Sequence, residues 1–308
     1  MRLVNPWKEG MKLKVDNAVI MAAGTSSRFA PLSYEKHKAM TVVKGEVLIE
    51  RQIKQLKTAG VPEVYLVTGC KAEQFDYLVP KYGVRLIHNP DYLTRNNNSS
   101  IWAARTILGN SYICSSDNYF AVNPFEVEVA NAYYAAEYAD GHTAEWCMTE
   151  DQDGFIDSVT IGGDNAWYML GHAFWSAEFS EEFLRILKAE YDLPETADKL
   201  WEKIFMAHLD TLKMTIRKYA PGVIYEFDTL DELREFDESY RTDTRSELIK
   251  RVALELGIAE QDMVHIKSMK STTAAAVGFE FDCGKGHFSY LYDTGALTKS
   301  TTGYSVSI

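Results

Sequence analysis

Alternating strand-like and helix-like segments over residues 18–117 constrain the fold of this chain more than any other feature. Four apolar runs of strand length occur there, at 18–24, 64–69, 84–89 and 111–117. The segments between them place apolar residues three and four apart, as amphipathic helices do. This alternation is typical of βαβ units, in which parallel strands are buried on both faces. We therefore predict an α/β fold with a mostly parallel sheet and helices on both faces.

Two of these helices have recognisable ends. One runs from Leu48 to Leu56 and stops at Gly60, and either Asn98 or Ser99 is expected to cap the helix before the fourth strand. Ligands on parallel sheets bind beyond the carboxyl ends of the strands. In this chain that edge includes Gly24, Gly69 and Asp117.

The middle third of the chain predicts a different kind of structure. Three aromatic and β-branched runs, at 144–150, 155–161 and 167–176, are separated by DQDG and GGDN turn signals, which favours an antiparallel meander. Acidic helices are expected at 178–191 and 196–209, and a short helix closes this part near residue 240.

The C-terminal residues form a third part. An amphipathic helix is predicted over 243–257, with a capping box from Thr244 to Glu247, and a hairpin over 276–295 turns at 284–286. Because 308 residues exceed what one core usually organises, we predict a catalytic domain over 1–240 and a small α+β appendage over 241–308.

The charge of the chain limits its partners. The formal charge of −12 argues against a nucleic-acid binder, which neutralises phosphates with basic residues. It is divided unevenly, at +6 over 1–125, −18 over 126–240 and 0 over 241–308. A basic part followed by an acidic part indicates a site that meets an anion on one side and a cation on the other.

Cysteine spacing and hydropathy predict the compartment. The four cysteines lie far apart, with no CxxC pair and no zinc-ligand spacing. No run of 18 apolar residues is present, and the first fifteen residues lack the apolar region of a signal peptide. We expect a cytoplasmic protein without a membrane partner.

The residues with the clearest chemistry lie at 22–40. Gly24 and the small hydroxyls Thr25 and Ser26 let backbone N–H groups approach an anion, and Arg28 and Lys38 supply positive charge. A lone Gly turn with two solvated cations would be a structural feature only. The spacing of both cations after the glycine favours a triphosphate site instead.

This run resembles the signature of the sugar-phosphate nucleotidyltransferase superfamily, in which AAG is followed by Arg, Pro and, ten residues after the Arg, Lys. Here these are Gly24, Arg28, Pro31 and Lys38, with His37 where the family usually has Pro. Further stretches resemble the bacterial CTP:phosphocholine cytidylyltransferases that supply choline to cell-surface glycans. They lie at 72–89, 96–105, 110–120, 144–148, 171–175, 200–203 and 224–236. The resemblance spans about 15–240.

The resemblance implies a Rossmann-like nucleotidyltransferase fold with an antiparallel acceptor-binding insertion. It implies that Lys38 and Arg28 are catalytic, with Lys38 stabilising charge on the α-phosphate as pyrophosphate leaves. Asn97 is expected near the acceptor. The nucleotide-binding residues that it implies are Ala22, Ala23, Gly24, Thr25, Ser26 and Gln74.

Two carboxylates are expected to hold Mg²⁺. Asp117 follows an apolar strand beside the phosphate loop, where a carboxylate either caps the next helix or binds a metal. The resemblance favours the metal, and it implies Glu202 as the second ligand, where relatives have Asp. The alternative for Glu202 is an ordinary surface residue of an acidic helix.

A choline acceptor adds a requirement for aromatic residues. A quaternary ammonium has no N–H, so it is recognised by aromatic faces and nearby carboxylates. Trp146 and Trp201 fall in the matched stretches and are the expected cage, with Glu145 as charge partner, although large aromatics on strands usually pack in cores. Relatives have Tyr where this chain has Leu200, which leaves phosphoethanolamine and 2-aminoethylphosphonate open as acceptors.

The sequence therefore predicts a Mg²⁺-dependent cytidylyltransferase that makes CDP-choline and pyrophosphate from CTP and phosphocholine. One alternative is a nucleotidyltransferase for phosphoethanolamine, 2-aminoethylphosphonate or a sugar 1-phosphate. Another is a non-catalytic nucleotide-binding regulatory protein. Residues 241–308 faintly resemble the start of a choline or ethanolamine kinase small lobe but contain no kinase catalytic motif. Their expected role is packing or homodimer formation.

Overall fold

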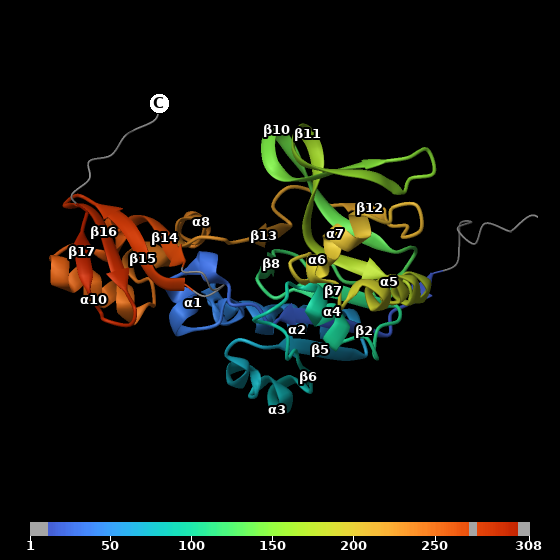
Figure 1. Ribbon diagram of the computed structural model, residues 1–308, viewed down its shortest axis with the longest axis horizontal. Helices are drawn as coiled ribbons and strands as arrows, with labels where there is room; N and C mark the ends of the chain where they lie inside the picture. Colours follow the sequence, from blue (N-terminus) through green and yellow to red (C-terminus); the bar gives the residue numbers. More distant parts are fainter. Residues whose placement is uncertain (1–11, 271–275, 301–308) are drawn as a thin grey trace, which may run out of the picture. The chain divides into compact units, whose positions relative to one another are not determined.

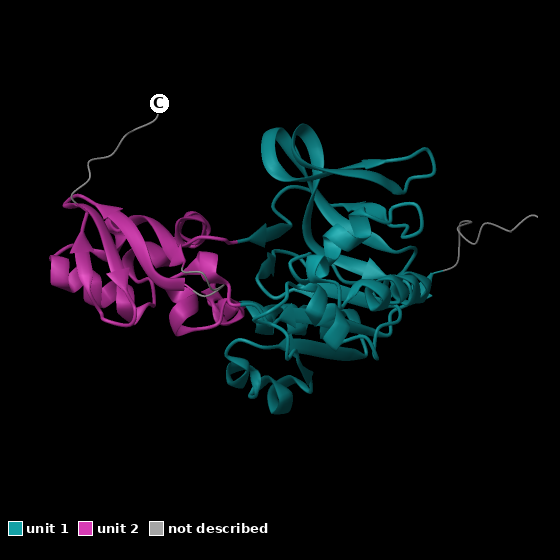
Figure 2. Cartoon of the chain, in the orientation of Figure 1, with its two compact units in different colours: residues 1–24, 48–226 teal, residues 25–47, 227–308 magenta. Residues whose placement is uncertain are grey.

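The computed structural model describes residues 12–270 and 276–300. The chain forms two compact units (Figure 2). The first unit contains residues 1–24 and 48–226, and the second contains 25–47 and 227–308. The C-terminal part of the second unit thus begins at Phe227 rather than at 241. The second unit also includes residues 25–47, which the sequence assigns to the catalytic domain. The catalytic role of residues 1–240 stays a prediction.

A seven-stranded sheet organises the described part of the first unit (Figure 1). β7, β2, β5 and β6 are parallel neighbours, β12 pairs parallel with β10, and β11 alone runs against its neighbours. This confirms the mostly parallel sheet. The strand order is β12 (Thr215–Lys218), β10 (Tyr133–Glu150), β11 (Ile156–Trp175), β7 (Ser111–Ser115), β2 (Asn17–Ala22), β5 (Glu63–Thr68) and β6 (Arg85–His88).

Both faces of this sheet are buried. Along β2, Val19 belongs to a large hydrophobic cluster, whereas Ala18 and Ile20 point to the opposite face and are equally inaccessible to solvent. Side chains from α4 (Asn98–Ala103), α5 (Ala177–Glu190) and α7 (Trp201–Met206) contribute to that cluster. Helix α2 (Leu48–Ala59) buries Leu48, Ile49, Ile53 and Leu56 outside it.

Several predicted elements of the first unit have different bounds in the structure. The segment after β5 forms a 3₁₀ turn, η3 (Ala72–Phe75), and a short helix, α3 (Leu78–Tyr82). The second acidic helix is divided into α6 (Pro194–Ala197) and α7. Neither Asn98 nor Ser99 caps α4, because the helix begins at Asn98 and its N-cap position is Asn97.

The predicted three-stranded meander is wrong. Its second and third runs are one continuous strand, β11, which pairs with β10 as a single long hairpin. The GGDN segment does not reverse the chain. Gly162 (φ 77°) and Asn165 (φ 53°) adopt left-handed backbone conformations there, and β11 accommodates them as local irregularities in its pairing with β10. Two short pairs complete the unit, β1 (Leu13–Lys14) with β9 (Glu128–Val129) and β8 (Asn118–Phe120) with β13 (Ile224–Glu226).

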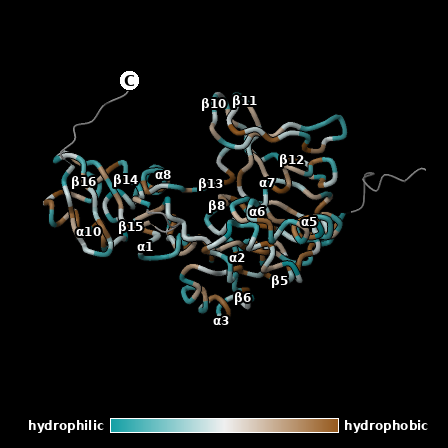
Figure 3. The backbone as a smooth tube through the Cα atoms, viewed as in Figure 1, coloured by the Kyte–Doolittle hydropathy of each residue, from teal (hydrophilic) through white to brown (hydrophobic). Residues whose placement is uncertain are grey.

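The second unit combines an N-terminal segment with the C-terminal part of the chain. Hydrophobic and hydrophilic residues alternate along its strands and helices (Figure 3). From the N-terminal segment come η1 (Ser27–Phe29), α1 (Leu32–Glu35), η2 (Lys38–Met40), β3 (Val42–Val43) and β4 (Glu46–Val47). The C-terminal part supplies α8 (Leu230–Phe236), α9 (Ser239–Thr242), α10 (Glu247–Leu256), η4 (Glu260–Asp262) and a sheet ordered β14 (Val264–Lys270), β15 (Ala276–Cys283), β16 (Gly286–Leu291) and β17 (Leu297–Lys299).

Helix α10 and the β15–β16 hairpin confirm the predicted C-terminal elements, but the predicted capping box is wrong. Ser246 is the N-cap, and its Oγ accepts the Ile249 N–H at 3.1 Å. Gly257 ends the helix in the left-handed region, as expected. Within the described residues, no helix is both long and apolar enough to cross a bilayer.

Candidate functional site

The carboxyl edge of the first unit's sheet carries three of the predicted positions. β7, β2 and β5 are parallel neighbours, so their carboxyl ends lie side by side. Gly24 follows β2 and is exposed, Gln74 lies in η3 after β5, and Asp117 follows β7. The topology therefore brings the ends of these three segments to one edge, as the sequence predicts.

The loops after β2 and β5 approach each other closely. The Ala23 carbonyl accepts the Cys70 N–H at 3.0 Å. A Cβ at Gly69 would lie 2.8 Å from the Ala23 carbonyl oxygen and 2.6 Å from Cγ of Tyr92, so only glycine fits there. Ala22 and Ala23 are buried, at 1% and 4% exposure. Their side chains therefore shape this edge, and only backbone groups remain for a ligand.

Asp117 lies in a tight turn between β7 and β8 and is partly buried. The next residue, Asn118, pairs with Glu226 across the β8–β13 ladder, and its Nδ2 donates to Glu226 Oε2 at 3.3 Å. The turn thus places a second carboxylate, Glu226, beside the residue that follows Asp117. Sequence reasoning did not select Glu226.

Glu202 lies at the start of α7, in surroundings that disfavour its charge. Asn97 Nδ2 donates to its Oε2 at 3.2 Å, and the Tyr134 hydroxyl donates to its Oε1 at 3.3 Å. Both donors are neutral. Burial raises the pKa of Glu202 to about 7, although the two hydrogen bonds act in the opposite direction. A cation beside this carboxylate would relieve the cost of burying its charge.

Three consecutive asparagines hold the segment that carries Glu202. Asn97 Oδ1 accepts the Trp201 N–H at 2.7 Å, while its Nδ2 holds Glu202. On either side, Asn96 Nδ2 donates to the Asp198 carbonyl at 3.1 Å and Asn98 Nδ2 donates to the Thr196 carbonyl at 2.9 Å. Residues 96–98 therefore hold residues 196–202 in place through side-chain hydrogen bonds. This places Asn97 against the predicted site residue Glu202.

The predicted aromatic cage is only partly present. Trp201 is 1% exposed, stacks on Tyr134 at 5.6 Å between ring centroids and packs edge-on against Trp175. Its ring faces are thus covered by protein in this structure. Trp146 is partly buried, and the Lys203 ammonium lies 5.7 Å from its ring centroid. Trp146 therefore already presents its ring to a cation.

Glu145 does not share the environment of Trp146. Consecutive residues of a strand point to opposite faces, and Glu145 is exposed while Trp146 packs against the hydrophobic cluster. Burial raises the pKa of Cys147 and of Tyr168, and the charge of Glu145 adds to both shifts, so this charge acts on those two side chains. The structure thus separates this predicted pair.

The signature cations lie in the second unit. Arg28 Nη1 is 2.5 Å from Asp228 Oδ2, and Lys38 Nζ is 3.5 Å from Asp228 Oδ1. The Lys38 side chain is 5% exposed, and its ammonium lies 5.7 Å from the Phe29 ring centroid. Ser26, in the left-handed region at φ 49°, starts the 3₁₀ turn η1 that carries Arg28, and Thr25 precedes it. One carboxylate therefore holds both cations.

Sequence reasoning missed Asp228, Tyr134 and Glu226. Asp228 lies in the matched stretch 224–236, but nothing in its local pattern links it to residues two hundred positions earlier. Tyr134 and Glu226 carried no signal of their own. Both Glu202 and Glu226 raise the pKa of Tyr134, so the two carboxylates act on one hydroxyl. Among the described residues, no group of three or more His, Cys, Asp or Glu side chains is arranged to hold a metal ion.

Comparisons with known proteins identify the family of this chain. Residues 18–123 match the family model described as a MobA-like NTP transferase domain. The chain is 30% identical over 221 residues to a choline-phosphate cytidylyltransferase of Streptococcus pneumoniae, covering 72% of this chain and 96% of that protein. It is 33% identical over 236 residues to a 2-aminoethylphosphonate cytidylyltransferase of Lancefieldella rimae, covering 75% and 96%.

The fold is also similar to that of solved enzymes. The structure of the CTP:phosphocholine cytidylyltransferase from Streptococcus pneumoniae matches with a TM-score of 0.69 and 31% identity, covering 74% of this chain and 99% of that one. The inositol-1-phosphate CTP transferase of T. maritima matches with a TM-score of 0.56 at 14% identity, which concerns the fold alone.

Proposed function

Because this chain belongs to the cytidylyltransferase family that includes choline-phosphate and 2-aminoethylphosphonate cytidylyltransferases, we propose that it transfers CMP from CTP to phosphocholine. The products are CDP-choline and pyrophosphate. The observation that carries the choice of acceptor is Glu202, a partly buried carboxylate that accepts hydrogen bonds from the neutral side chains of Asn97 and Tyr134 and whose pKa burial raises to about 7. Such a group favours a cationic ligand.

The ammonium head of the acceptor meets Glu202 under this proposal. A quaternary ammonium cannot donate a hydrogen bond, so it is bound by charge and by aromatic faces. Glu202 supplies the charge. Trp146 supplies a partly buried ring that already faces the Lys203 ammonium. The surroundings of Glu202 favour this role over the predicted metal ligation, which stays a prediction. Tyr134 donates a hydrogen bond to Glu202 and Trp201 stacks on Tyr134, so both residues support the acceptor site.

The nucleotide is bound through its phosphates. Backbone N–H groups after β2 approach the triphosphate, and Arg28 and Lys38 neutralise the charge that develops as pyrophosphate leaves. Asp228 contacts both cations, so it orients their side chains relative to each other. An ordered cation loses less conformational entropy on binding than a free one.

The carboxylates beside β8 fit a magnesium ion. Asp117 and Glu226 offer the oxygen ligands that a hard divalent cation prefers, and the amide of Asn118 holds Glu226 in place. We assign Asp117 and Glu226 to Mg²⁺, which when bound neutralises phosphate charge and orients the α-phosphate. Asn118 orients one of these ligands.

The reaction itself needs little proton chemistry. A phosphate oxygen of the acceptor forms a bond to the α-phosphorus of CTP, and the bond from that phosphorus to the bridging oxygen breaks as its electrons pass to pyrophosphate. The attacking phosphate is already ionised at neutral pH, so no residue acts as a general base. The protein contributes by positioning and by neutralising charge, through Lys38 and Arg28 on the nucleotide and Glu202 on the acceptor.

The second candidate acceptor is 2-aminoethylphosphonate. Its primary ammonium has N–H groups that Glu202 can accept, and a relative at 33% identity is named for that activity. Leu200, where relatives have Tyr, removes one aromatic wall that a quaternary ammonium would use. Glu202 therefore suits both head groups, and Trp146 favours the quaternary one.

Pyrophosphate release distinguishes these acceptors. We expect CTP with phosphocholine to give the highest kcat/KM among pairings of CTP, UTP and dTTP with phosphocholine, phosphoethanolamine, 2-aminoethylphosphonate and a sugar 1-phosphate. A higher value with 2-aminoethylphosphonate would establish the second candidate. CTP binding without pyrophosphate release for any acceptor would identify a regulatory protein instead.

A matched pair of variants tests the acceptor site. Glu202→Gln should raise the KM for phosphocholine by about tenfold or more, because a charge-assisted contact is lost. Glu145→Gln serves as the control, since Glu145 is exposed on the other face of β10. If Glu145→Gln has the larger effect, the charge partner is the one predicted from the sequence.

A further inference from the structure

The C-terminal part of the chain packs on the segment that contains Arg28 and Lys38. Residues 25–47 and 227–308 form one compact unit (Figure 2). Residues 241–308 lie outside the stretch that resembles cytidylyltransferases, and their expected role was packing or homodimer formation. The contacts within this unit give them a more specific role, because they fall on both sides of Lys38.

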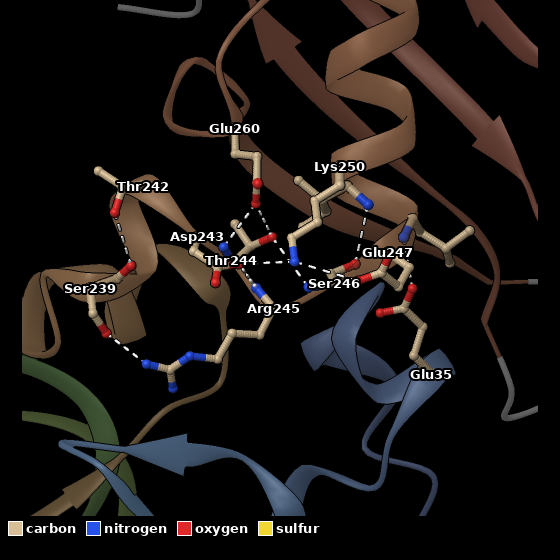
Figure 4. Close-up of polar contacts among 12 residues, drawn as sticks. Glu35, Ser239, Thr242, Asp243, Thr244, Arg245, Ser246, Glu247, Lys250 and Glu260 are labelled. Atoms are coloured by element: carbon tan, nitrogen blue, oxygen red, sulfur yellow. Dashed lines mark hydrogen bonds and ion pairs between the residues drawn. The ribbon is translucent and has the colours of Figure 1, made fainter.

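The first contact is a helix cap supplied by the signature segment. Glu35, at the end of α1, accepts the Leu248 N–H through Oε1 at 2.7 Å (Figure 4). Leu248 is in the first turn of α10, where the N–H groups have no partner within the helix. The Glu35 carboxylate therefore satisfies one of them and faces the positive end of the helix dipole. Ser246 satisfies another.

The second contact is a pair of stacked rings. Tyr34 and Tyr292 lie 3.8 Å apart between ring centroids at an angle of 14°. Tyr34 precedes Glu35, so two neighbouring residues between Arg28 and Lys38 are each held by the C-terminal part. The Tyr292 hydroxyl is buried and has no hydrogen-bond partner among the residues that the structure describes. The contribution of Tyr292 therefore lies in its ring.

Further contacts hold the chain after Lys38. The Val42 carbonyl accepts the Tyr240 hydroxyl at 2.8 Å and Arg245 Nη1 at 2.5 Å. The Lys44 N–H donates to Asp237 Oδ2 at 2.7 Å, and the Lys44 ammonium lies 5.0 Å from the ring of Phe236. Lys38 thus lies between two anchored stretches.

The C-terminal part is itself fixed by buried polar contacts. Thr244 is fully buried, and its N–H and hydroxyl both donate to Glu260 Oε2 (Figure 4). The buried guanidinium of Arg234 donates to the Glu260 carbonyl at 2.8 Å and to the Met263 carbonyl at 2.6 Å. These bonds join α8 and η4 to the residues just before α10 and β14. The part that contacts the signature segment is therefore held together by its own hydrogen bonds.

We infer that residues 237–270 and 276–292 are a positioning scaffold for the segment 28–44 and thereby set the affinity of the protein for CTP. Tyr292 and Arg245 are positioning residues in this scheme, because neither is assigned to any ligand. The inference rests on the proposed function, which gives Arg28 and Lys38 the CTP phosphates. The physical reason is entropic: a cation held at one place before binding loses less freedom when the nucleotide arrives.

The experiment compares ring removal with hydroxyl removal in the full chain. Tyr292→Ala removes the stack on Tyr34, whereas Tyr292→Phe keeps it and removes only an unpartnered hydroxyl. We expect Tyr292→Ala to weaken CTP binding about fivefold by calorimetry, the scale of one aromatic pair, and Tyr292→Phe to match the wild type. Arg245→Ala, at an exposed residue, should also weaken CTP binding.

Hydrogen exchange supplies a readout that does not depend on catalysis. Amides between residues 32 and 44 should exchange several-fold faster in Tyr292→Ala and Arg245→Ala than in the wild type and Tyr292→Phe. In turnover, the KM for CTP should rise while kcat and the KM for the acceptor change by less than about twofold.

The outcomes separate this inference from the proposed function. Unchanged CTP affinity and unchanged exchange in both variants would overturn the scaffold, even in an active enzyme. A Tyr292→Phe defect equal to that of Tyr292→Ala would also overturn it, since the ring would then not be the supporting group. If the wild type binds CTP but releases no pyrophosphate with any acceptor, the proposed function fails, and CTP affinity and exchange still decide the scaffold.

Discussion

Two titratable residues of the first unit, the buried His172 and the partly buried Glu202, should oppose each other in the pH dependence of stability. His172 is 1% exposed, and its Nε2 lies 2.9 Å from the Tyr133 hydroxyl. Burial, with a smaller effect from Arg217, lowers its pKa from 6.5 to about 3. Burial raises the pKa of Glu202 from 4.5 to about 7. One group resists gaining a proton in the folded state, and the other resists losing one.

The signs follow from which state binds more protons. Below pH 6.5 the unfolded chain protonates His172 while the folded protein does not, so stability is lost as the pH falls from 6.5 toward 3. Above pH 4.5 the unfolded chain ionises Glu202 while the folded protein keeps the proton, so stability is lost as the pH rises from 4.5 toward 7. Between these values the two effects have opposite slopes.

The magnitudes nearly cancel in the wild type. Between pH 7.5 and 4.5, linkage gives a loss of about 2–3 kcal/mol from His172 and a gain of at most about 3 kcal/mol from Glu202. The Glu202 value is an upper bound, because its side chain is partly exposed and solvent screens its charge. Removing either group should uncover the contribution of the other.

Urea unfolding of Glu202→Gln and His172→Gln in EDTA tests this reasoning. Tryptophan fluorescence reports the first unit, because every tryptophan in the described part of the chain belongs to it. From pH 7.5 to 4.5, the free energy of unfolding of Glu202→Gln should fall relative to the wild type by about 2–3 kcal/mol, and that of His172→Gln should rise by a similar amount. Other titrating groups are common to all three proteins and cancel in the comparison. Parallel pH profiles for the three proteins would refute the reasoning.

Three further predictions concern activity. Lys38→Ala and Asp117→Ala should each lower turnover at least about a hundredfold, the scale for losing one electrostatic stabiliser, and near-normal pyrophosphate release in either variant would contradict its assignment. Asn97→Ala should raise the KM for the acceptor by about tenfold and the KM for CTP by less, because the hydrogen bonds to Glu202 and to the Trp201 N–H are lost. Steady-state kinetics with each substrate varied in turn checks this. Removal of divalent ions with EDTA should abolish turnover and added Mg²⁺ should restore it, whereas full activity in EDTA would exclude the metal.

The parallel sheet could be predicted because its strands are buried on both faces. Residues on both faces of β2 are inaccessible, so the whole strand is apolar and stands out from the amphipathic helices beside it. The β10–β11 hairpin could not be predicted in the same way. A Gly-Gly-Asp-Asn segment suits a turn and an irregular strand equally, and the choice between them depends on the distant residues His142 and Thr143, which pair with it.

The N-cap of α10 also could not be predicted from the local sequence alone. Thr244 and Ser246 both precede the apolar pattern of α10 and both suit an N-cap. The structure selects Ser246 because Glu260, sixteen residues away, accepts both polar hydrogens of Thr244. A local pattern lists the residues able to cap, and a distant carboxylate decides which of them does.

The sequence by itself determined the class of fold, and it predicted a site at the carboxyl edge of the sheet, at Gly24 and Asp117, with Arg28 and Lys38 as its cations. These depend on local periodicity and on spacing along the chain, which are properties of neighbouring residues.

Only the tertiary structure decided how side chains distant in sequence meet. It buried Trp201, surrounded Glu202 with Asn97 and Tyr134, and placed Asp228 on both signature cations. It also packed the C-terminal part on the signature segment. Burial and pKa depend on which surfaces come together in space, and that is fixed when the whole chain folds.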